Sequence, residues 1–175
     1  MATRSIRPST TDSTPLLWGK SLLNAVLFFA IFMVALPWAS HALLPARVPL
    51  LLGLGTAVGG TLFVAGIAVW LLCLDVFSRR GRGTPFPLDA PRHLVTSGPF
   101  RVIRNPIMAA EIAVIWGEAM YFSSVGIFLY AAVITALGHL MVVYVEEPEL
   151  RDRFDGQYER YCRQVPRWFP RSRRA

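Results

Sequence analysis

The chain has 175 residues, of which 54% are hydrophobic and 17% are charged. Soluble globular domains carry about 25% charged residues, so this composition argues against a water-soluble enzyme or a disordered chain and indicates an integral membrane protein. The 18 Lys and Arg against 11 Asp and Glu give a net charge of +7. Such a basic balance suits either nucleic acid or a membrane surface, and the positions of the charges decide between them.

The apolar runs predict an all-α integral membrane fold with four transmembrane helices. A helix needs about 20 apolar residues to cross the hydrocarbon core. The four runs lie at residues 21–46, 48–74, 107–122 and 125–145. Pro37 and Trp38 are expected to mark the interfacial end of the first helix. Because the break at Ser123 and Ser124 is so short, the last two helices are predicted to form an antiparallel hairpin.

The basic residues predict the orientation. They lie in the N-terminal segment (1–20), in the loop between the second and third helices (75–106) and in the tail (146–175), which places 17 of the 18 on one face. Arg47 is the exception. Cytoplasmic segments are enriched in Lys and Arg, so we expect both termini and the loop to be cytoplasmic. Anionic lipid headgroups then account for the basic charge without a nucleic-acid partner, and Cys73 and Cys162 are expected to be free thiols.

Glycines and ionisable residues inside the runs suggest helix packing and chemistry. Gly55 and Gly59 form a small-xxx-small pair, which favours close helix packing over a nucleotide-binding loop, because no strand precedes them. Ionisable side chains in a membrane usually face a cavity or a partner. These side chains are Glu111 and Glu118 on one face of the third helix, and His139 with Glu146 on one face of the fourth.

The fourth helix is expected to end before Pro148. Glu146, Glu147 and Glu149 would then stand at a helix C-terminus, against the macrodipole, which is either a sign of function or a set of solvated headgroup-level carboxylates. After Pro148, apolar residues recur at helical spacing, at Leu150, Phe154, Tyr158, Tyr161 and Val165. This stripe predicts a helix that lies on the membrane surface or over the loop.

Asn105 and Pro106 predict the start of the third helix, with Asn105 as its cap. The free N–H groups of such a terminus could receive an anion or a polar ligand. The alternative is that the pair is only a start signal.

The run LVTSGPFRVIRNP at residues 94–106, followed after one helical hairpin by Glu146-Glu147, Phe154, Tyr158, Tyr161, Val165-Pro166 and Phe169-Pro170, resembles the isoprenylcysteine carboxyl methyltransferase family. It is also similar to the related phospholipid methyltransferases and their bacterial members. The resemblance covers about half of the chain, residues 81–171. It implies an S-adenosylmethionine site between the loop and the tail at the cytoplasmic face of the membrane.

By this resemblance, the cofactor-binding residues are expected at Arg92, His93, Leu94, Val95, Phe100, Asn105, Pro106, Ile107, Met108, Glu146 and Glu147. The family has His and Tyr where this chain has Asn105 and Met108. Glu146 would face the amino group of the methionine moiety. The carboxyl methyltransferases place an arginine for the substrate carboxylate where this chain has Val142, which argues against prenylcysteine recognition.

The candidate catalytic residues are Arg104, Glu118 and His139. Arg104 could replace the missing arginine, while Glu118, His139 or Glu111 could act as a general base for a neutral acceptor. The acceptor is expected to be lipidic or prenylated and to enter from the bilayer, with no metal required. Two alternatives remain open: an NADPH-dependent membrane reductase of the sterol type, and a non-catalytic lipid-binding relative.

Overall fold

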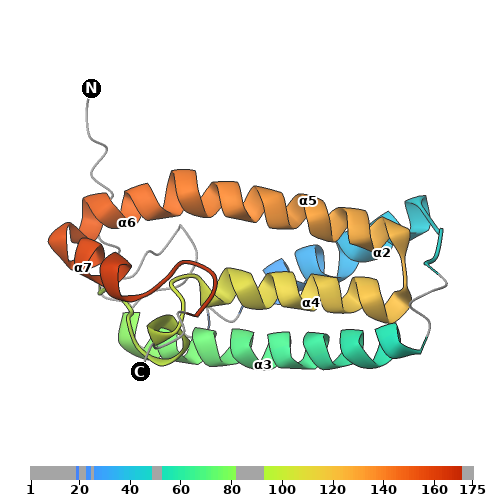
Figure 1. Cartoon of the computed structure of the whole chain (residues 1–175), viewed down its shortest axis with the longest axis horizontal. Coiled ribbons are helices and arrows are strands. Elements are labelled where there is room, and N and C mark those ends of the chain that lie inside the picture. The colour runs from blue at the N-terminus through green and yellow to red at the C-terminus, as the bar shows by residue number, and fades with distance from the viewer. Residues whose placement is uncertain (1–18, 20–22, 25, 49–52, 82–92, 171–175) are drawn as a thin grey trace.

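The computed structural model describes residues 19, 23–24, 26–48, 53–81 and 93–170, and these residues form an all-helical protein (Figure 1). The elements are η1 (Phe29–Ala35), α2 (Leu36–Leu43), α3 (Leu54–Gly81), η4 (Gly98–Arg101), α4 (Pro106–Phe122), α5 (Val125–Met141), η5 (Val142–Glu146), α6 (Glu147–Phe154) and α7 (Gly156–Gln164). The helices α3, α4 and α5 lie along the long axis, and α6 and α7 gather at one end (Figure 1).

Three helical stretches are long and apolar enough to cross a membrane: Val26–Leu43, Leu54–Phe77 and Val125–Phe154. The prediction of an integral membrane protein is therefore supported, and three of the four expected spans have the necessary length and composition. The remaining helix, α4, has 17 residues and runs antiparallel to both α3 and α5 (Figure 1). Its crossing of the membrane stays a prediction.

Two prolines that were expected to mark helix ends lie inside continuous helices instead. Pro37 follows the π-helical segment η1 and is buried in the first turn of α2. Pro148 follows the π-helical segment η5 and lies in the first turn of α6. Proline lacks an N–H and is tolerated in a first helical turn, and each π-helical segment resets the hydrogen-bond pattern just before the ring. The carboxylates near Pro148 therefore begin α6 and do not end the fourth helix.

Glycines bring α3 and α4 into direct backbone contact. A Cβ atom added to Gly59 would lie 2.6 Å from the carbonyl oxygen of Gly117, and one added to Gly117 would lie 2.7 Å from the amide nitrogen of Phe63. Gly66 is equally close to Val114. The predicted close packing is thus present at Gly59. It continues along α3 to Gly66, which the sequence did not indicate.

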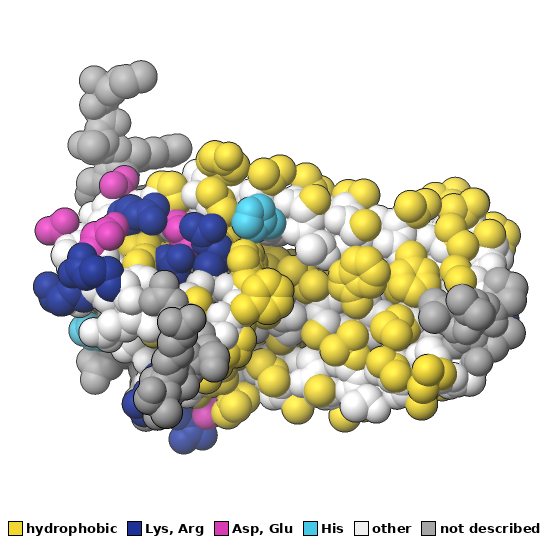
Figure 2. Space-filling model, in the orientation of Figure 1, with side chains coloured by type: hydrophobic (Ala, Val, Ile, Leu, Met, Phe, Trp, Pro, Cys, Tyr) yellow, Lys and Arg dark blue, Asp and Glu magenta, His cyan; other side chains and the backbone are white. Residues whose placement is uncertain are grey.

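An apolar core joins the first helix to α4 and α5. It contains the buried residues Met33, Val114, Ile115, Ala119, Ile127 and Ala131. The charged side chains on the visible face gather at the end that carries α6 and α7, while apolar side chains dominate the remainder (Figure 2). The fold therefore separates a charged end from an apolar body, which is the arrangement expected when a membrane surrounds the body.

Candidate functional site

The loop before α4 is docked onto the end of α3. Phe100, in η4, is 7% exposed and packs with Cys73, Val95 and Phe77. Gly98 turns the chain into η4 with a φ of 61°, and a Cβ atom there would lie 3.0 Å from a methyl group of Val76. This backbone conformation and this close approach both favour glycine. Leu94, Val95 and Phe100, which the resemblance assigned to the cofactor, therefore also shape the apolar side of the loop.

The tail folds over this loop. Tyr158, Tyr161 and Val165 are buried, and Leu94 of the loop packs against them. The Tyr161 hydroxyl donates a hydrogen bond to the carbonyl oxygen of Phe100 at 2.6 Å. Of the two positions expected for the apolar stripe, the structure shows the one over the loop. The stripe is divided between α6 and α7, because Asp155 breaks the helix with a φ of 41°.

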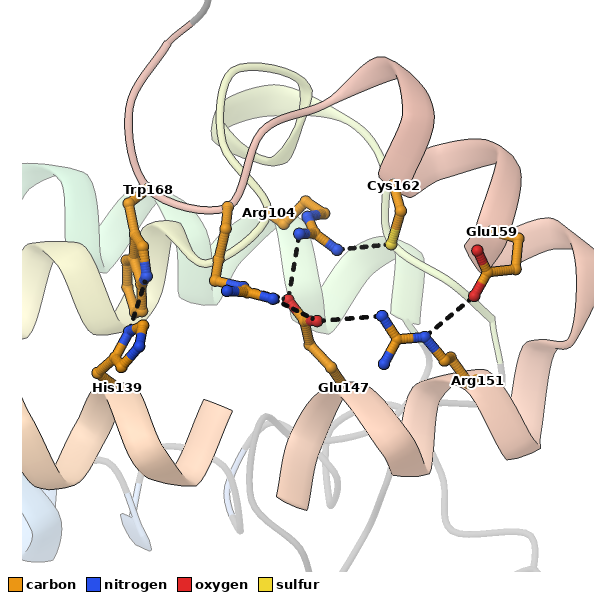
Figure 3. Close-up of polar contacts among 8 residues, drawn as sticks. Arg104, His139, Glu147, Arg151, Glu159, Cys162 and Trp168 are labelled. Atoms are coloured by element: carbon orange, nitrogen blue, oxygen red, sulfur yellow. Dashed lines mark hydrogen bonds and ion pairs between the residues drawn. The ribbon is translucent and has the colours of Figure 1, made fainter. Parts of the chain in front are cut away.

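A buried carboxylate ties the tail to the loop (Figure 3). Glu147 is 1% exposed, and its Oε1 lies 3.2 Å from Nη2 of Arg104 and 2.6 Å from Nε of Arg167. Its Oε2 accepts hydrogen bonds from Nη2 of Arg167 at 2.9 Å and from Nη2 of Arg151 at 3.3 Å. Arg104 also donates to the Cys162 thiol sulfur. A buried charge is tolerated only when it is paired and hydrogen-bonded in this way.

Burial and hydrogen bonding shift the pKa values of three side chains in the tail. The hydrogen bond to Glu147 raises the pKa of Arg167 above its ordinary value. Burial raises the pKa of the Tyr158 and Tyr161 phenols. Both phenols therefore stay protonated at neutral pH, and Tyr161 can donate its hydrogen bond to the loop.

Unpartnered polar atoms lie at the start of α4. As predicted, Asn105 occupies the N-cap position and Pro106 the first turn, but the Asn105 side chain makes no capping hydrogen bond. Asn105 Nδ2 and Arg104 Nε are buried without a hydrogen-bond partner among the described residues, as is Ser97 Oγ at the start of η4. Buried polar atoms without partners are uncommon. Together with the helix terminus, the Asn105 and Arg104 donors form a region suited to a ligand carboxylate.

Two further carboxylates stand in α4 and at the end of η5. Glu111 accepts a hydrogen bond from Nε1 of Trp70 at 3.1 Å. It is also within electrostatic range of Glu146, which stands in the last position of η5. In the described part of the chain, neither carboxylate has an ion-pair partner, unlike the neighbouring Glu147. Two unneutralised carboxylates favour the binding of a cationic ligand.

Other predicted site residues lie elsewhere. His139 is exposed, and its Nδ1 is 3.1 Å from Nε1 of Trp168 in the tail, away from Glu147 (Figure 3). Met108 packs its sulfur over Gly138 between α4 and α5. His93 is exposed, and Arg92 lies outside the described residues. Glu118 is twelve residues beyond Pro106, which is about 18 Å along the helix axis.

Two residues of the charged cluster, Arg151 and Arg167, and the His139 partner Trp168 were not predicted from the sequence. Arg167 and Trp168 directly follow the Val165-Pro166 pair that carried the resemblance, so their position in the motif was an available signal. Arg151 is four residues after Glu147, the spacing at which an acidic and a basic side chain meet on a helix. That signal was also readable, although the burial of Glu147 was not.

A sequence model of the phospholipid methyltransferase family matches residues 54–157, from the start of α3 into α7. The match covers more than half of the chain. The chain belongs to the phospholipid methyltransferase family. A comparison with curated proteins gives no match. The predicted kinship is confirmed, and the broad assignment to membrane methyltransferases follows from it.

Methyltransferases of the phospholipid methyltransferase family generally use S-adenosylmethionine, and the residues present fit this cofactor. Its amino acid portion carries one carboxylate and one ammonium group, and its sulfonium adds a second positive charge. The unpartnered Asn105 amide at the start of α4 suits the carboxylate. The unneutralised Glu146 and Glu111 suit the positive charges. Glu147 does not fit this role, because three arginines already occupy both of its oxygens.

Proposed function

We propose that the protein is an S-adenosylmethionine-dependent methyltransferase that acts on a lipidic acceptor drawn from the bilayer. The observation that carries this proposal is the pair formed by Glu111 and Glu146, which has no cationic partner among the described residues. Glu111 stands on α4 about 8 Å along the helix axis from Pro106, whose N-cap residue Asn105 has an unpartnered amide. A ligand with a carboxylate and two positive charges matches both features. The family match supports this activity over that of an NADPH-dependent reductase.

In this proposal, one group of residues holds the cofactor and another positions the tail. Asn105 and the first turn of α4 hold the carboxylate of the methionine moiety, and Glu146 holds its ammonium group through a charge-assisted hydrogen bond. The cofactor supplies an electrophilic methyl group on a sulfonium. Arg104, Glu147 and Arg167 act as positioning residues, because they fix the tail against the loop and exclude water from the site. Alignment and exclusion of water can supply much of the rate of a methyl transfer.

A neutral acceptor needs a base, and Glu111 is the best placed of the three candidates. Glu118 lies about 18 Å further along α4 than Pro106, and His139 is exposed and bonded to Trp168. Glu111 stands beside Glu146 and is oriented by the indole N–H of Trp70. We therefore propose that Glu111 accepts the proton that an amine or hydroxyl acceptor releases. A carboxylate acceptor would need no base.

The acceptor is not expected to be a prenylcysteine carboxylate. Val142, at the position where the carboxyl methyltransferases have an arginine, is 0% exposed and packed in the protein. Both terminal nitrogens of Arg104 are already bound to Glu147 and Cys162, so its paired donors are not available as a replacement. A neutral or amine-bearing lipid headgroup suits this site better. The basic residues support an orientation with this site and both termini on the cytoplasmic side.

Calorimetric titration of the purified protein with S-adenosylmethionine and, separately, with NADPH tests the cofactor. Incubation with membrane lipid extracts and methyl-labelled S-adenosylmethionine then identifies the acceptor class. We expect saturable binding of S-adenosylmethionine and labelled lipid. Binding of NADPH alone would favour the reductase, and binding of S-adenosylmethionine without any labelled product would favour a non-catalytic relative.

A further inference from the structure

A cavity lies at the opposite end of the helices from the tail. Its volume is about 530 Å³, within the range of small-molecule sites. Residues from α2, α3, α4 and the start of α5 line it, and the lining is mostly apolar. Glu118, which the proposed methyl-transfer site does not use, is one of these residues.

The cavity contains a carboxylate without a partner. Glu118 is partly buried, and among the described residues it makes no hydrogen bond or ion pair. It stands four residues before Phe122, the last residue of α4, which is about 6 Å from the helix end. Glu118 therefore lies close to the end of α4 that points away from the tail. An unpaired carboxylate beside a hydrocarbon core is costly unless a ligand or water neutralises it.

Basic and aromatic side chains share the cavity with Glu118. Arg47 lines it, and the chain around Arg47 is held by hydrogen bonds from Val48 N to Ser123 O at 2.9 Å and from Val125 N to Ala46 O at 3.0 Å. Nδ1 of His41 is 2.9 Å from Oγ of the buried Ser124. This contact fixes the imidazole ring at the cavity wall, with its other nitrogen free for a ligand.

Four aromatic rings complete the wall: Trp38, Phe63, Tyr121 and Phe122. Trp38 and Tyr121 are 63% and 48% exposed, so their rings are available to a ligand. Aromatic faces beside a carboxylate form the usual environment for an ammonium group. Arginine recognises phosphate through charge-assisted hydrogen bonds.

We propose that this cavity binds the headgroup of an aminophospholipid from the leaflet opposite the tail. The ammonium group is held by Glu118 and the aromatic rings, the phosphate by Arg47 and His41, and the first part of the acyl chains by the apolar wall. A purely anionic lipid would leave Glu118 unneutralised, and a purely cationic amphiphile would be repelled by Arg47. A zwitterionic head satisfies both charges. This site is separate from the methyl-transfer site and does not depend on its assignment.

Lipid titrations of the full chain in a neutral maltoside detergent test this proposal. The probes are short-chain phosphatidylethanolamine and phosphatidylglycerol, which share the phosphate but differ in the ammonium group. We expect the wild type to bind phosphatidylethanolamine about tenfold more tightly, the effect of one charge-assisted contact. Water-soluble phosphoethanolamine should compete only at much higher concentration, and equal competition would overturn the assignment to a lipid.

Two variants and one matched control locate the binding. Glu118→Gln should abolish the preference for phosphatidylethanolamine. Val64→Trp should block both lipids, because Val64 lines the cavity and is 66% exposed, which leaves room for a larger side chain without disturbing the core. Glu149→Gln makes the same change on an exposed carboxylate of the tail, outside both the cavity and the proposed methyl-transfer site, and it should keep the preference. Thermal unfolding checks that each variant is folded. A preference that survives Glu118→Gln, or that Glu149→Gln removes equally, would overturn the proposal.

Discussion

Arg104 and Glu147 lie on opposite sides of the α4–α5 pair in the sequence, yet their side chains form a buried ion pair of 3.2 Å. Arg104 belongs to the loop motif and Glu147 to the start of the tail. The pair therefore joins the two segments that carry the family resemblance. Arg167 closes the same contact from the far end of the tail at 2.6 Å. The site between loop and tail depends on this connection.

Removing the charge of Glu147 should loosen the tail. In Glu147→Gln, Arg104 and Arg167 would lose the carboxylate that neutralises them, and breaking a buried ion pair costs about 3–5 kcal/mol. We expect a lower unfolding temperature and faster amide hydrogen exchange in α7. Glu149→Gln is the control. Glu149 is 48% exposed, and its carboxylate lies 3.9 Å from Arg153, in a surface ion pair that contributes less than about 1 kcal/mol. Equal effects of the two variants on unfolding temperature and amide exchange would show that Glu147 does not hold the tail against the loop.

Removing the charge of Glu146 should weaken cofactor binding and leave the fold intact. Hydrogen bonds to charged groups contribute about 1.5–3 kcal/mol, so Glu146→Gln should reduce the affinity for S-adenosylmethionine by about tenfold or more. Calorimetric titration measures this change. An unchanged affinity in a folded Glu146→Gln protein would rule out the role.

A methyl group at the contact between α3 and α4 should be destabilising. In Gly117→Ala, the new Cβ would lie 2.7 Å from the backbone nitrogen of Phe63, and overpacking of this kind costs about 1–3 kcal/mol. Gly60→Ala is the matched control, because its Cβ would meet only the Tyr121 ring at 3.6 Å. Thermal unfolding in detergent compares the two. We expect Gly60→Ala to be at least as stable as the wild type, because alanine favours a helix over glycine, and Gly117→Ala to be the least stable of the three.

Single cysteines test the orientation. A membrane-impermeant thiol reagent applied from the cytoplasmic side should label cysteines at Ser5, Thr84 and Ser172 and leave one at Arg47 unlabelled. Cys73 and Cys162 would first be replaced, so that the added thiol is the one that reacts. Labelling of position 84 from the outer face would contradict four crossings with both termini inside.

The packed Val142 leads to a prediction about the substrate. With no arginine at this position, N-acetyl farnesylcysteine should be methylated poorly or not at all, because nothing presents a paired set of donors to its carboxylate. Labelled S-adenosylmethionine and this probe measure the transfer directly. Efficient, saturable carboxyl methylation would show that another group recognises the carboxylate.

The sequence was a good guide to the loop and the tail because their signals are local. Asn105 and Pro106 mark a helix start through their own chemistry, and the apolar stripe from Tyr158 to Val165 has helical spacing. It was a poorer guide at the prolines. Pro37 and Pro148 normally end or kink a helix. Whether a π-helical segment accommodates such a ring depends on the neighbours that hold the helix together, and a single sequence does not display these.

By itself, the sequence determined that this is a membrane protein, which family it belongs to and where its basic charge lies, because composition and motif spacing depend on residues near one another in the chain. Only the tertiary structure decided what surrounds each glutamate. Glu111 and Glu118 share one helical face, but they lie about 10 Å apart along the helix axis. Glu111 accepts a hydrogen bond from Trp70, and Glu118 lines the cavity beside Arg47. Likewise, Glu147 is bound by arginines that the chain brings from the loop and the tail, while the adjacent Glu146 has no ion-pair partner among the described residues.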